Sequence, residues 1–68
     1  MKHVYQDYRH VLEHAAQSEE ILADQFAMLA NELERQGQPR IAEFLQGSSR
    51  HHRDRSTKNR ALIASLER

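Results

Sequence analysis

Residues 35–41 read RQGQPRI, and this short stretch separates two long helical patterns. Gly37 is the type of residue that commonly follows a helix C-terminus, and Pro39 suits the first turn of a new helix. A connection this short returns the chain antiparallel beside the preceding helix. The sequence therefore predicts a single domain over residues 1–68, with helices over about 3–36 and 40–67 and a turn at 37–39.

Upstream of the turn, apolar residues are spaced in threes and fours, as one face of a helix requires. They are Val4, Tyr8, Val11, Ala15, Leu22, Phe26, Leu29 and Leu33, and the stripe is widened by Leu12, Ala16, Ala23, Ala27 and Ala30. A wide stripe implies burial against more than one helix, and so short a chain makes only a thin core alone. We therefore expect an all-α, antiparallel two-helix hairpin that forms a homodimeric four-helix bundle.

Downstream of the turn, the second helix has apolar residues at its two ends and none from Gln46 to Arg60. One helical frame nevertheless continues through the whole segment: Ile41, Leu45, Ser48, His52, Arg55, Asn59, Leu62 and Leu66. Gly47 and the two serines after it could mark a kink or a break at 47–49. Because the frame keeps its phase across this polar stretch, a continuous helix is favoured.

The formal net charge of zero hides an asymmetry between the two halves of the chain. Residues 1–36 contain three Lys or Arg and seven Asp or Glu, whereas residues 37–68 contain seven Lys or Arg and three Asp or Glu. The halves therefore carry −4 and +4. Opposite charges of this kind favour an antiparallel pairing of the two helices, although each exposed ion pair contributes little free energy.

In such a hairpin, two residues equally far from Gln38 along the chain lie level with each other. His52 is then level with Asp24, and Arg55 with Ile21 and Glu20. Asn59 is level with Gln17 and Ser18. We expect a polar layer at mid-bundle, to which Gln17, Ser18, Arg55 and Asn59 contribute. Its members must pair well, since a partly satisfied buried network is costly.

Two segments carry a resemblance: SEEILADQFAMLA at 18–30 and IAEFLQGSSRHH at 41–52. They resemble the first two helices of ferritin-like proteins, the rubrerythrins and encapsulated ferritins. That family has a Glu on the first helix and Glu-x-x-His about thirty residues later. Glu19, Ser49 and His52 have this spacing. The resemblance implies a two-helix chain that completes a four-helix bundle, and its iron site, by dimerising.

Ser49 stands where that family has a bridging glutamate, so each chain lacks one carboxylate of the di-iron ligand set. Two Glu19 and two His52 side chains in a dimer could still hold one divalent ion, such as iron, manganese or zinc. Glu20 and Asp24 are candidate helpers. An ordinary Glu–His pair in the polar layer is the favoured interpretation, and no cofactor is then expected.

Other candidate sites are weaker. His10 and His14 share a helix face but lack the Glu of the HExxH motif, so surface chelation explains them. The basic run from Arg50 to Arg60 has no interleaved aromatic residue, which disfavours nucleic acid as its partner. The N-terminal residues form neither a signal sequence nor a membrane span, so we expect a cytoplasmic protein. Catalytic arrangements of Ser, His and Asp, and cysteine, are absent from the sequence.

The sequence thus favours a small, non-enzymatic interaction or assembly module. A metal-binding, ferritin-like protein using Glu19 and His52 is the first alternative. A nucleic-acid-binding hairpin using Arg50 to Arg60 is the second. Binding of an unidentified protein partner is also compatible with the first interpretation.

Overall fold

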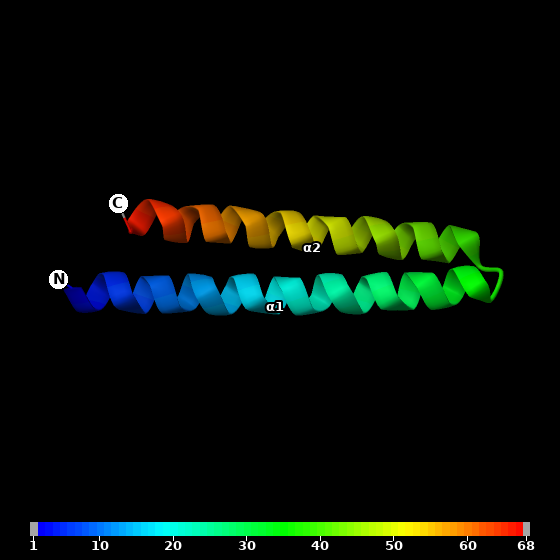
Figure 1. Ribbon diagram of the computed structural model, residues 1–68, viewed down its shortest axis with the longest axis horizontal. Coiled ribbons are helices and arrows are strands. Elements are labelled where there is room, and N and C mark those ends of the chain that lie inside the picture. Colours follow the sequence, from blue (N-terminus) through cyan, green and yellow to red (C-terminus); the bar gives the residue numbers. More distant parts are fainter. Residues whose placement is uncertain (1, 68) are drawn as a thin grey trace.

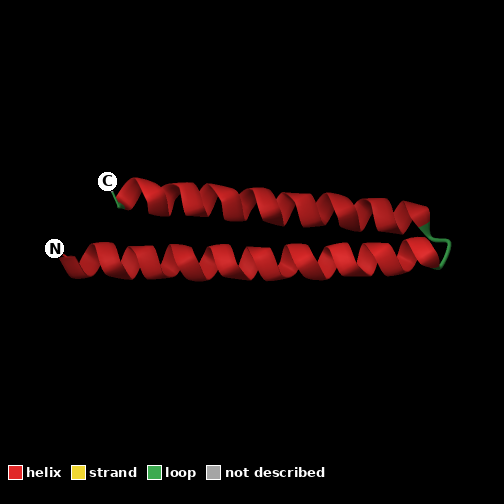
Figure 2. Ribbon diagram, in the orientation of Figure 1, coloured by secondary structure: helices red, strands yellow, loops and turns green. Residues whose placement is uncertain are grey.

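The computed structural model describes residues 2–67, with side chains described from Gln6 to Glu67. It contains two α-helices, α1 at Lys2–Arg35 and α2 at Pro39–Leu66. The helices run antiparallel side by side, and both chain termini lie at the same end (Figure 1). Colouring by secondary structure shows helix throughout except at the turn and the chain end, and no strand in the part described (Figure 2). The predicted all-α helical hairpin is confirmed.

The turn between the helices is held by backbone hydrogen bonds around Gly37, which has a φ of 79°. The Gly37 amide donates to the carbonyl of Glu34 at 3.1 Å, and the Gln38 amide donates to that of Leu33 at 2.9 Å. This pair of bonds is the Schellman motif, in which a glycine in the left-handed region satisfies the last carbonyls of a helix. Pro39 then begins α2, where its missing amide proton leaves no helical bond unmade.

The two helices touch through rows of small side chains. Ala16, Ala23 and Ala30 of α1 have no exposed surface. We define the contact row as these three alanines with Ala42, Ser49, Ser56 and Ile63 of α2, which are each 8% exposed or less. Both rows repeat every seven residues, the spacing that keeps two packed helices in register. Their small side chains allow the two backbones to approach closely.

Most of the large exposed apolar side chains lie to one side of the contact row, whereas Ile21 and Met28, which are also exposed, lie on the outer side of α1. We define the open face by Tyr8, Val11, Leu22 and Leu29 of α1 with Ile41, Phe44 and Leu62 of α2, whose exposed fractions run from 38% to 74%. Most of these positions come one residue before a contact-row position, which places them on the same side of the hairpin. Five half-buried side chains lie on this side between the exposed residues of α1 and those of α2: Leu12, Phe26, Leu33, Leu45 and Leu66.

The predicted apolar stripe and the observed contact row therefore differ. On α1 three of the four alanines that widen the stripe form the contact, while Tyr8 and Leu22 stay exposed. On α2 the contact is made one residue later than the predicted frame, at Ser49 and Ser56 instead of Ser48 and Arg55. The physical reason is that the smallest side chains permit the closest approach of two helices. The side chain of Val4 lies outside the described residues.

α2 continues as a single helix through 47–49, without the break that Gly47 could have marked. Ser49, the last residue of this segment, is 6% exposed, and its Oγ donates a hydrogen bond to the carbonyl oxygen of Ala23 at 2.7 Å. The polar stretch is therefore attached to α1 close to its first residues. Neither helix has, within the described residues, the length of apolar sequence that crossing a membrane requires.

Candidate functional site

The candidate site lies on the open face, near the middle of the hairpin, where Glu19 of α1 meets His52 of α2. The Nδ1 atom of His52 shares a hydrogen bond with Oε2 of Glu19, with the carboxylate as the acceptor. Both side chains are largely enclosed, with 15% exposed for Glu19 and 22% for His52. Each lies three residues after a contact-row position, Ala16 and Ser49, so both point to the same side.

Aromatic rings support the histidine from two directions. The ring of Phe26 lies parallel to that of His52, with a centroid separation of 5.5 Å and an interplanar angle of 6°. The His51 ring approaches edge-on at 5.6 Å. Stacking on Phe26 fixes the plane of the imidazole, and the hydrogen bond to Glu19 fixes its rotation within that plane. The His52 ring is therefore held in one orientation.

Arg55 completes the cluster from one turn further along α2. Its Nε lies 3.3 Å from Oε1 of Glu19, so the two carboxylate oxygens have different partners. The hydrogen bond with His52, and then the positive charge of Arg55, hold the pKa of Glu19 below its usual range despite its partial burial. Glu19 is thus an ionised acceptor for two groups. We call Glu19, His52 and Arg55 the polar cluster.

A second set of ion pairs lies on the other side of the contact row. Arg60 donates two hydrogen bonds to Glu20, from Nε at 2.6 Å and from Nη2 at 2.8 Å. The buried hydroxyl of Ser56 donates a third, also at 2.6 Å. These bonds, Arg60 first and Ser56 second, lower the pKa of Glu20 to about 2.

The basic run of α2 therefore contacts the acidic residues of α1. Arg53 lies 3.2 Å from Asp24, and Arg55 and Arg60 bind Glu19 and Glu20. Three of the five basic side chains between Arg50 and Arg60 thus have a carboxylate of the same chain as their partner. This arrangement supports intramolecular pairing of the run over contact with nucleic-acid phosphates.

We call the expectation that residues equally far from Gln38 lie level with each other the level rule. It predicted which residues lie at the same height along the hairpin but not which ones touch. It holds at Glu20 with Ser56 and at Arg9 with Glu67, both of which are in contact. His52, however, binds Glu19 and not Asp24, because Asp24 lies at the same height on the opposite side of the contact row.

For the same reason, the predicted polar layer changes its membership. Gln17 and Ser18 are exposed on α1, whereas Asn59 is half-buried. Arg55 is in the polar cluster, although its partner is Glu19 and not Glu20. The serines that do bind across the hairpin, Ser49 and Ser56, were not predicted. The seven-residue repeat that they form with Ala42 and Ile63 is the sequence signal that could have identified them.

The residues present do not fit a di-iron centre. Among the described residues, no three side chains of His, Cys, Asp or Glu gather as metal ligands. Ser49, at the position of the bridging glutamate, lies in the contact row and binds the Ala23 backbone, so a longer side chain there would press against α1. The candidate helpers Glu20 and Asp24 bind Arg60 and Arg53, away from Glu19 and His52.

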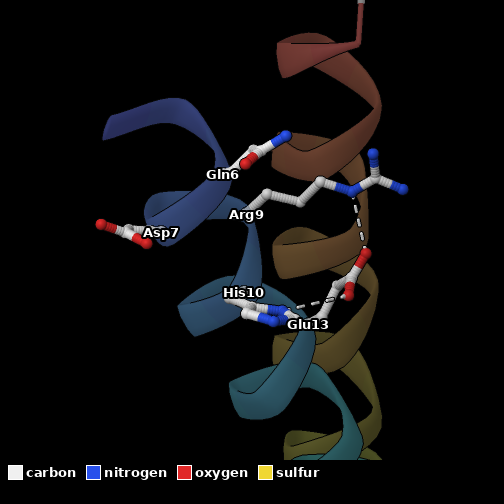
Figure 3. Close-up of a pocket in the computed structure, with 5 residues that line it drawn as sticks. All are labelled: Gln6, Asp7, Arg9, His10 and Glu13. Atoms are coloured by element: carbon white, nitrogen blue, oxygen red, sulfur yellow. Dashed lines mark hydrogen bonds and ion pairs between the residues drawn. The ribbon is translucent and has the colours of Figure 1, made fainter. Parts of the chain in front are cut away.

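A shallow depression near the free end of α1 has another set of charged side chains, drawn in Figure 3. Arg9 binds Glu13 at 2.9 Å and also reaches Glu67 at 2.8 Å, which links α1 to the residue after α2. His10 lies 4.0 Å from Glu13 and is highly exposed. His14 is exposed as well. This end of the hairpin is a surface ion-pair network.

Comparison of the chain with protein-family models, curated proteins and solved structures gives no match. The function is therefore argued from the open face and the polar cluster themselves.

Proposed function

We propose that this chain is a small, non-enzymatic assembly module that pairs with a second copy of itself through the open face. The observation that carries the proposal is the distribution of side-chain size. The hairpin buries mainly alanine and serine, and no large side chain is completely buried among the described residues. Leucine, isoleucine, phenylalanine and tyrosine lie exposed along one side. Covering them would supply the apolar burial that a single hairpin lacks.

The dimensions of the hairpin suit such a partner. Its extents are 54 × 14 × 11 Å, so one long face has roughly the area that a stable interface buries on each partner, about 800 Å². Exposed large apolar side chains gathered on one face commonly mark an interaction site. A second copy offers the same length and the same apolar positions.

The polar cluster would lie near the centre of that interface. Glu19, His52 and Arg55 already satisfy one another within one chain, which lowers the cost of enclosing them. A paired polar group among apolar positions restricts register, because its charged atoms must stay paired or hydrated when a second copy covers the face. In this proposal the polar cluster determines where along the face the second copy docks.

Sedimentation equilibrium of the wild-type chain and of two lysine variants tests the proposal. We expect the wild type to have twice the chain mass of 8.0 kDa. Leu22→Lys should weaken dimerisation roughly 100-fold or more, since two charges would enter one apolar interface. Met28→Lys is the matched control: Met28 is 72% exposed, but its position on α1 faces away from the open face.

A wild type that remains at 8.0 kDa at millimolar concentration would overturn the proposal. Equal weakening by Leu22→Lys and Met28→Lys would also count against it, because the interface would then not be the open face.

A further inference from the structure

The open face has two edges, one formed by residues of α1 and the other by residues of α2. The two edges differ in charge and in the number of apolar residues. The α1 edge is uncharged from Tyr8 to Leu29, with Val11, Ala15, Ser18, Leu22 and Gln25 between them. The α2 edge is apolar only near its ends, at Ile41, Phe44 and Leu62. Its middle contains His51, Arg55 and Lys58, all exposed. Which edge meets which therefore matters to any second copy that covers the face.

A second copy related by a two-fold axis can cover the open face in two ways, which differ in the direction of the axis. With the axis across the helices, α1 lies against the partner's α1, and α2 against the partner's α2. With the axis along the helices, each α1 lies against the partner's α2. Neighbouring helices are antiparallel in both arrangements. The turns lie at opposite ends of the bundle in the first arrangement and at the same end in the second.

The first arrangement brings like charges together. The middle of the α2 edge would meet its own copy, so that Arg55 and Lys58 would approach the partner's Arg55 and the partner's His51. Like charges across an interface disfavour association. Each copy also brings its own Glu19, but that carboxylate is only 15% exposed and already paired with Arg55, whereas the Arg55 side chain is 59% exposed, so the basic side chains are the ones that would meet.

The second arrangement matches the two edges. In the level rule, Leu62 is level with His14 and so would lie between the partner's Val11 and the partner's Ala15. Phe44 is level with Glu32, close to the partner's Leu29. The basic middle of α2 would face uncharged residues, with Arg55 close to the partner's Leu22. The long aliphatic part of an arginine packs on apolar surface while its guanidinium stays paired or hydrated.

The charges of the whole helices favour the same choice. α1 has three basic and seven acidic residues, and α2 has six basic and two acidic residues, so the helices carry −4 and +4. In the second arrangement each helix has two neighbours of the opposite sign. In the first, each has one neighbour of its own sign.

We infer that the second copy docks with the two-fold axis parallel to the helices, so that α1 of each chain packs against α2 of the other and both turns lie at one end of the bundle. This inference rests on the proposed self-association. It specifies the side chains in contact, which self-association alone does not.

Pulsed electron–electron double resonance with a spin label at the turn tests this arrangement. The sequence has no cysteine, so Gln38→Cys provides a unique label position. Gln38 is exposed, and its side chain makes no capping hydrogen bond to α2. With helices packed about 10 Å apart, two turns at one end should give a label separation of about 25 Å. Turns at opposite ends should give about 50 Å at 1.5 Å of rise per residue.

Thr57→Cys is the matched control. Thr57 is exposed toward the middle of the hairpin, so its labels should have a similar separation in both arrangements and report only that the chains pair. Dilution with unlabelled wild type should reduce the signal of both variants, because the distances are between chains.

The separations expected for Gln38→Cys distinguish the possible failures. A distance near 25 Å supports the inference, whereas one near 50 Å overturns it and leaves the proposed dimer in place. Absence of dipolar coupling at both positions, together with a mass of 8.0 kDa, would overturn the dimer and the inference alike.

Discussion

The contact row and the open face of this hairpin use opposite kinds of side chain. The contact row holds α1 against α2 with alanines, two hydrogen-bonded serines and Ile63. None of these side chains is more than 8% exposed. The open face has the large apolar residues, including Phe44 at 74% exposure and Val11 at 66%. Close approach of two helices requires small side chains, whereas large buried area requires big ones.

The difference separates two tasks that one core usually performs together. Small residues and the ion pairs on α2 determine how the chain folds back on itself. Large residues remain available for a partner, and most of the apolar free energy of a four-helix bundle would come from them. Substitutions in the two regions should therefore have different consequences, the first for the hairpin and the second for association.

The largest effect is expected from Ala23→Leu, in the middle of the contact row. Ala23 has no exposed surface, and its carbonyl accepts the Ser49 hydrogen bond. Three additional carbon atoms there would force the helices apart, at a cost of roughly 3 kcal/mol in the free energy of unfolding. Urea denaturation followed by circular dichroism at 222 nm should show this as a lower midpoint.

Ala61→Leu is the control for that substitution. Ala61 is exposed on α2, so the same change in size meets no neighbouring helix and should alter stability by less than about 0.5 kcal/mol. If the two variants unfold at the same urea concentration, the close contact at Ala23 is incorrect.

The hairpin could be predicted from sequence because its determinants are local. Gly37 and Pro39 end one helix and begin the next, and the spacing of apolar residues defines the helices on both sides. The contact row was not recognised, because apolar stripes are usually identified by their largest members. Ala16, Ala23 and Ala30 were assigned to the margin of the stripe, although they are the residues that touch α2.

Sequence spacing also singled out Glu19 and His52, which the structure brings into contact across 33 positions of the chain. Their surroundings were less accessible to sequence reasoning. The position of the turn determines which residues of the two helices lie level with each other. The side of the hairpin on which a side chain lies depends on which row of residues makes the contact between the helices. Because the observed contact row differs from the predicted one, Asp24 and Glu20 lie on the side away from His52, and Gln17 is exposed.

A smaller effect is expected from acid, and it should distinguish the hairpin from its association. The pKa of Glu20 is about 2 in the folded chain, against an ordinary value of 4.5, because Arg60 and Ser56 bind the ionised form. A carboxylate with a lowered folded pKa stabilises the fold above its ordinary value, and this contribution is lost as the pH falls from about 4.5 toward 2.

Glu20→Gln should therefore lower the urea midpoint at pH 7, by less than Ala23→Leu does, and the difference from wild type should shrink steadily below pH 4.5. Because Glu20 lies on the side of the contact row away from the open face, the dimerisation constant should not change with this substitution. Glu43→Gln, at an exposed position of α2, serves as the control. A difference that stays constant down to pH 2 would contradict the role given to Glu20.

The smallest effect is expected from a metal chelator, and it separates the assembly module from the metal-binding alternative. Glu19 already binds His52 and Arg55, so a divalent ion would have to displace Arg55 and recruit the partner's Glu19 and the partner's His52. An assembly module should keep its melting temperature in chelator within about 1 °C. A specifically bound ion present at 100 times its dissociation constant contributes about 2.7 kcal/mol, so its removal should lower the melting temperature by on the order of 10 °C. Stoichiometric iron, manganese or zinc in the purified wild type, absent from His52→Ala but retained in His51→Ala, would favour the metal-binding alternative, since of these two histidines it is His52 that is hydrogen-bonded to Glu19.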